Sequence, residues 1–169
     1  VFLIVASRAN RSYVAGIRYL VIHVISGVLH LAGALILNGQ SGSLRFEHIG
    51  LTGAGTMLIF IAFGIKCAFP LLHNWLTDDY PEATPTGTVF LSAFTTKVAV
   101  YALARGFAGT EVLVYIGSVI KCFPIFYAVI ETDLRRVLAY SMINHICLMV
   151  LGTGPGSALS IHGRSPIAL

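Results

Sequence analysis

Residues 51–76 are LTGAGTMLIFIAFGIKCAFPLLHNWL, an apolar run in which Lys66 is the only residue with a full charge at neutral pH. A single helix of this length is about 39 Å long, more than the hydrocarbon core of a bilayer. Pro70 predicts a break, because proline lacks an N–H and its ring clashes with the carbonyl four positions earlier. That carbonyl belongs to Lys66. We therefore predict a membrane helix interrupted beside a buried charge, an arrangement from which transporters build ion sites.

The composition of the whole chain is that of a membrane protein. It contains 56% hydrophobic and 11% charged residues, whereas soluble domains have about 25% charged residues. Further apolar runs of the length that a bilayer requires cover Tyr19–Leu37, Gly87–Ala104, Glu111–Ile130 and Leu134–Gly152. With a partial span at Val1–Ala6, they predict an all-α polytopic transmembrane bundle of about five full spans plus a partial one. Residues 1–152 form this partial domain, and residues 153–169 are expected to be an atypical, truncated or frame-shifted tail.

The arginines predict the orientation in the membrane. Short connections make successive spans antiparallel, so Ser7–Arg18, Thr77–Thr86 and Glu131–Arg136 fall on one side. That side carries five arginines, at positions 8, 11, 18, 135 and 136. Because cytoplasmic loops are enriched in basic residues, we predict that these loops are cytoplasmic and that the chain lies in the cell (inner) membrane. The same rule accounts for the net charge of +4 without a nucleic-acid partner.

Lys66 and Lys97 are the main candidate functional residues. A charged side chain at the bilayer centre costs at least about 2.5–3.5 kcal/mol, so its default interpretation is functional. Counting from the connection between their spans places both roughly 15–17 Å into the membrane, at the same level. The span that contains Lys97 has no acidic residue that could pair with it. Tyr101, four positions later, carries the polar group on the same helix face. A desolvated lysine without a fixed counter-ion exchanges its proton more readily near neutral pH, as a proton relay requires.

The histidines of the spans are secondary candidates. His145 titrates near physiological pH, so it either extends a relay or packs as a hydrogen-bonded histidine. His23, Ser26 and His30 share one helix face. They either form hydrogen bonds between helices or, as a histidine pair, ligate a haem.

Two other polar residues carry less weight. Lys121 lies near the middle of its span beside Pro124, and His73 follows Lys66 by seven positions with the Pro70 break between them. The three cysteines form no CxxC pair and are expected to be buried hydrophobes. The sequence has no phosphate loop, nucleophile elbow or zinc spacing. We predict neither a cofactor nor a metal.

Four stretches resemble one family. They are FGIKCAFPLLHNWL (63–76), YPEATPTGT (80–88), TKVAVYALAR (96–105) and DLRRVLAYS (133–141). Together they closely resemble the antiporter-like membrane subunits, which are the MrpD component of the Mrp-type Na⁺/H⁺ antiporters and the homologous proton-pumping subunits of respiratory complex I. The similarity runs from about residue 1 to residue 152. The MrpD component is the most similar, on the first stretch and on FPIFY (123–127).

The resemblance implies a function and a set of site residues. The lysines of the family's broken seventh helix and of its eighth helix fall on Lys66 and Lys97, and a tenth-helix motif falls on Ala139–Ser141 and His145. A proton would pass between the two lysines, in a subunit that works with partner subunits and exchanges protons for a monovalent cation, Na⁺. Lys121 stands where the family has an uncharged residue, so we do not assign it to the relay.

The alternatives remain open at this point. The family's glutamate partner of the first lysine lies on a helix upstream of Val1, so the chain is expected to be a fragment that is inactive by itself. The shared motifs also fit a proton-pumping subunit of an NADH-quinone oxidoreductase or membrane-bound hydrogenase. A third alternative belongs to a different class of protein: a membrane anchor for electron transfer, in which His23 and His30 ligate a haem. In the favoured interpretation the chain is a transporter subunit and not an enzyme.

Overall fold

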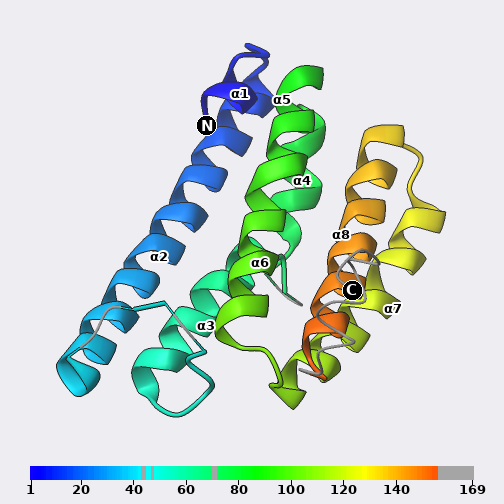
Figure 1. Ribbon diagram of the computed structural model, residues 1–169. Coiled ribbons are helices and arrows are strands. Elements are labelled where there is room, and N and C mark those ends of the chain that lie inside the picture. The colour runs from blue at the N-terminus through cyan, green and yellow to red at the C-terminus, as the bar shows by residue number, and fades with distance from the viewer. Residues whose placement is uncertain (43–44, 47, 70–71, 156–169) are drawn as a thin grey trace, which may run out of the picture.

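The protein is a bundle of helices in the computed structural model, which describes residues 1–42, 45–46, 48–69 and 72–155 (Figure 1). The helices are α1 (Phe2–Val5), α2 (Asn10–Ser41), α3 (Ala54–Lys66), α4 (Asn74–Glu82), α5 (Pro85–Phe90), the π-helical turn η1 (Leu91–Thr95), α6 (Thr96–Gly106), α7 (Glu111–Ile130) and α8 (Leu134–Thr153). Helices α5, η1 and α6 follow one another without a gap. The described residues contain no strand.

The helix lengths confirm the predicted polytopic bundle. Among the residues that the structure describes, four stretches are long and apolar enough to cross a membrane: Asn10–Gln40, Pro85–Gly106, Glu111–Ile130 and Leu134–Thr153. The fifth apolar element, α3, is shorter. The predicted span Glu111–Ile130 matches α7 to the residue. The chain is therefore a multi-pass membrane protein.

Two predicted connections are in fact mostly helical. Helix α2 begins at Asn10, inside the expected connection Ser7–Arg18, and α4 continues through Thr77–Glu82. Hydropathy detects only the apolar part of a helix, whereas backbone hydrogen bonding continues into the polar residues beyond the bilayer core. Both extensions bring charged side chains of α2 and α4 into contact, as described below.

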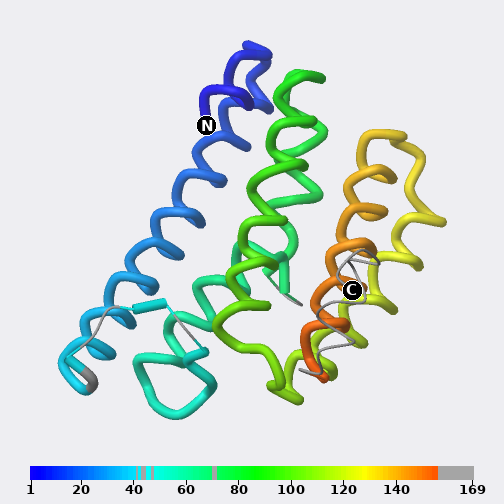
Figure 2. The backbone as a smooth tube through the Cα atoms, in the orientation of Figure 1, coloured from blue at the N-terminus to red at the C-terminus, as the bar shows by residue number. Residues whose placement is uncertain are grey.

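The predicted interruption lies between α3 and α4 (Figure 2). Helix α3 ends at Lys66, and Ala68 adopts the left-handed conformation with φ of 55°. The Phe69 N–H donates to the Gly64 carbonyl at 3.0 Å, which helps to close the helix end. Pro70 lies outside the described residues, so its part in the break remains a prediction.

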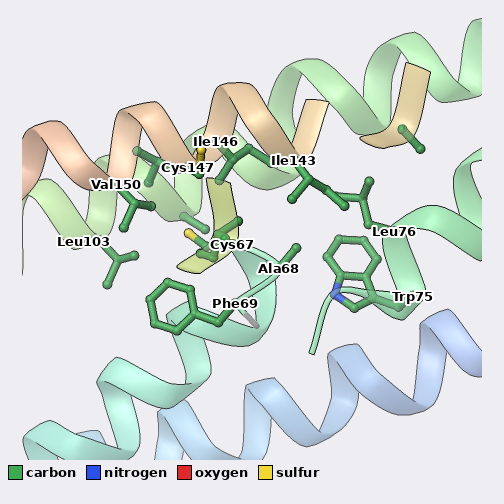
Figure 3. Close-up of a cluster of buried hydrophobic side chains, with 14 of the residues drawn as sticks. Cys67, Ala68, Phe69, Trp75, Leu76, Leu103, Ile143, Ile146, Cys147 and Val150 are labelled. Atoms are coloured by element: carbon green, nitrogen blue, oxygen red, sulfur yellow. The ribbon is translucent and has the colours of Figure 1, made fainter. Parts of the chain in front are cut away.

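The helices form two groups joined through α4 and α6. Helix α2 packs against α3 and α4, α7 packs against α8, and both α4 and α6 contact α8. The junction is an apolar core around the end of α3, where Cys67, Phe69, Leu103 and Ile143 are buried (Figure 3). Of the cysteines, Cys67 and Cys147 are buried as expected, whereas Cys122 is exposed.

Gly33 allows α2 and α3 to approach closely. A Cβ atom at Gly33 would lie 2.7 Å from the Gly55 carbonyl oxygen and 2.7 Å from the Ile59 side chain. We expect Gly33→Ala to lower the melting temperature in detergent by several degrees, because the Gly55 backbone cannot move aside without shifting α3. Gly39→Ala on the same helix is the control, because its Cβ would meet no described atom within 4 Å. Equal melting temperatures for the two variants would contradict this prediction.

Candidate functional site

Lys66 lies at the break, within electrostatic reach of two histidines of α2. It is the last residue of α3 and is partly buried. His23 and His30 of α2 both interact electrostatically with it. Between them, the buried Ser26 hydroxyl donates to the Ala62 carbonyl at 2.9 Å. The stripe predicted on α2 therefore faces α3, and its predicted hydrogen bonding between helices is confirmed at Ser26.

Lys97 lies directly after the π-helical turn. It is the second residue of α6, is partly buried, and follows η1 by two positions. The intervening Thr96 is fully buried, and its hydroxyl donates to the Ser92 carbonyl at 3.5 Å. Single π-helical turns within α-helices occur frequently at functional sites. Helices α3 and α6 pack against each other, so the two lysines lie on neighbouring elements.

An aromatic cluster connects the start of α4 to α2 and α3. The His23 ring stacks on Tyr19 with centroids 3.9 Å apart and meets Trp75 edge-on at 4.8 Å. Trp75 is buried, and its indole N–H donates to the Ile65 carbonyl at 3.0 Å. That carbonyl belongs to the residue before Lys66. The cluster thus holds the two halves of the broken span together.

Asp79 is a buried carboxylate that the sequence-based predictions did not include. It is 0% exposed, and neither carboxylate oxygen has a hydrogen-bond partner within the described part of the chain. Burial raises the pKa of Asp79 to about 7, and the positive charge of Arg18 opposes this shift. A sequence signal existed, because Asp79 follows Trp75 by four positions and therefore shares its helix face.

The neighbouring Asp78 is ion-paired with Arg18 of α2. Arg135 of α8 donates to the Pro81 carbonyl at 3.0 Å, at the same end of α4. Arg11, Arg18 and Arg136 line a cleft of about 420 Å³ there, together with Asp78 and Glu82. These four arginines, which were predicted to lie on the same side of the membrane, thus lie at the same end of the bundle. We call it the arginine-rich end: Arg11, Arg18, Arg135 and Arg136.

The other candidates lie elsewhere in the bundle. His145 is exposed and lines a cavity of about 470 Å³ between η1 and α8, with Ser92 and Ser141. The His73 ring packs on Phe123 of α7 with centroids 4.9 Å apart. Tyr101 and Lys121 are exposed. His23 and His30 interact electrostatically with Lys66. No described contact connects His73 or His145 to these three residues. The His30 ring lies 5.0 Å from the Phe63 ring, centroid to centroid.

The comparison with known families agrees with this architecture. A family model described as "NADH:quinone oxidoreductase/Mrp antiporter, TM" matches residues 1–164. The chain belongs to this family. Its curated relatives include NADH-quinone oxidoreductase subunit N of Desulforudis audaxviator, which is 31% identical over 96% of this chain and 36% of the relative. Hydrogenase-4 component B of Escherichia coli is 27% identical over 95% of this chain and 27% of the relative.

Chains of two solved membrane complexes share the fold. A chain of the Mrp complex from Dietzia sp. DQ12-45-1b superposes with a TM-score of 0.79 and 25% identity, over 86% of this chain and 30% of that chain. A chain of an archaeal membrane-bound sulfane sulfur reductase superposes with a TM-score of 0.79 at 24% identity, over 90% of this chain and 35% of that chain. The chain thus spans about a third of the proteins that it matches.

Proposed function

We propose that this chain is the central part of a membrane subunit that translocates protons through Lys66 and Lys97 in a multisubunit cation/proton antiporter. In this proposal protons are exchanged for a monovalent cation, Na⁺, with the help of partner subunits. The arginine-rich end faces the cytoplasm of the cell (inner) membrane. The observation that carries the proposal is the position of Lys66 at the interruption between α3 and α4, in a chain of the antiporter family.

The local geometry supports a transferable proton on Lys66. The carbonyl groups at a helix C-terminus carry partial negative charge, which stabilises a cation there. His23 and His30 oppose that charge when they are protonated, because all three groups are then positive. Lys66 thus lies among groups that can either attract or repel a positive charge. A proton that leaves its ammonium group reaches the neutral amine of Lys97, and the charge moves from α3 to α6.

A second candidate function is a proton-pumping subunit of a respiratory complex. The names of the curated relatives favour it, since they include NADH-quinone oxidoreductase subunit N and hydrogenase-4 component B. The antiporter assignment rests on the motif resemblance and on the likeness to the Mrp complex. Lys66 and Lys97 would move protons in both, and only the source of energy would differ.

Inverted membrane vesicles that contain the complete subunit and its partners separate these functions. In an antiporter, adding Na⁺ should collapse a preformed proton gradient, as reported by a pH-sensitive dye. In a redox-driven pump, Na⁺ should have little effect, whereas NADH or another reductant should build the gradient. Vesicles without the subunit provide the baseline. If neither treatment moves protons above that baseline, the proposed function is wrong.

A further inference from the structure

Three buried side-chain atoms have no hydrogen-bond partner among the described residues, and all lie where α2 meets α4. They are Nε2 of His23 and the two carboxylate oxygens of Asp79. Burying a polar atom without a partner costs about 1–3 kcal/mol, so such atoms call for an explanation. The proposed lysine pair does not provide one.

These groups follow one another along α2 and its neighbours. Arg18 pairs with Asp78 at the arginine-rich end, and Tyr19, the next residue, interacts with Asp79. One turn further, about 6 Å along the helix, His23 stacks on Tyr19 and interacts with Lys66. We call Asp79, Tyr19 and His23 the polar row. It connects the arginine-rich end of the bundle to the helix break.

The hydrogen-bonding capacities along the row are complementary. Nδ1 of His23 lies 2.9 Å from the Tyr19 carbonyl oxygen, which only accepts. Nδ1 must therefore carry the hydrogen, and in the neutral ring Nε2 is a bare acceptor. A protonated Asp79 carboxyl is a donor, and its ionised form is an acceptor only. A protonated Asp79 can thus donate a proton, and Nε2 of a neutral His23 can accept one.

We propose that the polar row is the entry for protons from the arginine-rich end to Lys66. This inference rests on the proposed function and deepens it. Asp79 takes a proton from that side and passes it through bridging water to Nε2 of His23, because the two groups make no direct hydrogen bond. The imidazolium that forms gives the proton to the neutral amine of Lys66, and His23 returns to its neutral state. Asp79 is then ionised and ready for the next proton.

The surroundings of Asp79 suit this role near neutral pH. Burial raises the pKa of Asp79 to about 7. The positive charge of Arg18 on α2 lowers the pKa, and the neighbouring Asp78 raises it. Tyr19 of α2 and Tyr80 of α4 also interact with this carboxyl, and α8 contributes Arg135 at the nearby Pro81 carbonyl. As the pH at the arginine-rich end rises through about 7, Asp79 loses its proton, so entry should slow.

The test measures the initial rate of proton translocation against the pH at the arginine-rich end, in vesicles with the complete subunit and its partners. We expect Asp79→Asn to lower the rate by about tenfold or more and to remove the inflection near pH 7. His23→Gln, which cannot ionise, should lower the rate similarly. Glu82→Gln is the matched control: it changes a partly buried carboxylate at the end of α4 that the row does not contain, and should keep the wild-type rate and profile.

Stability measurements separate a relay role from a folding role. Asn is neutral at all pH values, so Asp79→Asn should melt no lower than the wild type at pH 8, where the native carboxylate is charged and unpaired. If Asp79→Asn fails to assemble, the transport rate and pH profile of His23→Gln test the inference instead. Wild-type rates and profiles in both variants would overturn the inference, as would an equal loss in Glu82→Gln. Lys66→Ala and Lys97→Ala are measured in the same vesicles, and full activity of both would instead overturn the proposed function itself.

Discussion

Lys66→Ala is expected to abolish proton-coupled transport and to leave the assembly of the complex intact. The variant removes the ionisable group at the end of α3 and leaves no other lysine on that helix. Lys66 is only partly buried and is not part of the apolar core. The bundle should therefore tolerate its loss. The measurement is the dye-reported transport rate in inverted vesicles, together with recovery of the partner subunits on affinity purification. Lys97→Ala should have the same effect.

Lys66→Arg makes this test sharper. Arginine keeps the positive charge but cannot release its proton in a protein. If Lys66 acts by exchanging a proton, Lys66→Arg should be as inactive as Lys66→Ala. If it acts only through its charge, the arginine variant should retain transport. Lys121→Ala, which alters an exposed lysine on α7, is the control and should transport normally. Wild-type transport by both alanine variants, at positions 66 and 97, would overturn the relay.

The second large effect is expected at Trp75, and it concerns stability. Trp75→Ala should destabilise the protein by about 3–5 kcal/mol, the usual cost of truncating a buried aromatic residue. The indole is 1% exposed, packs edge-on against His23 and Tyr80, and hydrogen-bonds to the Ile65 carbonyl. Its loss leaves a cavity between the two halves of the broken span. The melting temperature in detergent measures the effect.

Trp75→Phe distinguishes packing from hydrogen bonding. Phenylalanine fills most of the volume but lacks the N–H, and the Ile65 carbonyl still accepts from the Ala68 N–H at 3.2 Å. We therefore expect a smaller loss, of about 1 kcal/mol. Tyr115→Ala, which truncates an exposed aromatic residue on α7, should change the melting temperature little. If Trp75→Phe and Trp75→Ala have equal melting temperatures, packing of the Trp75 ring does not stabilise the contact between α3 and α4.

Much of the fold follows from apolar run length. The predicted span Glu111–Ile130 and helix α7 coincide, and Leu134–Gly152 differs from α8 by one residue. The start of α2 was harder to predict, because the helix extends back to Asn10 through polar and charged residues that lie outside the predicted span. The end of α3 at Lys66 agrees with the predicted break. The π-helical turn before Lys97 was not predicted from the sequence.

The sequence by itself determined the membrane class and the family, because apolar run length and motif wording are local properties. It also singled out the two lysines as candidates, because charges within apolar runs are rare, and their role stays a prediction. The grouping of the side chains was decided only by tertiary structure. Asp78 and Asp79 are adjacent in the sequence, yet one pairs with Arg18 at the surface and the other is buried without a described partner. That difference depends on how α4 packs in the bundle, because adjacent residues of a helix do not share a face. The packing of the helices also places His23 and His30 within electrostatic reach of Lys66. It places His145 in the separate cavity between η1 and α8.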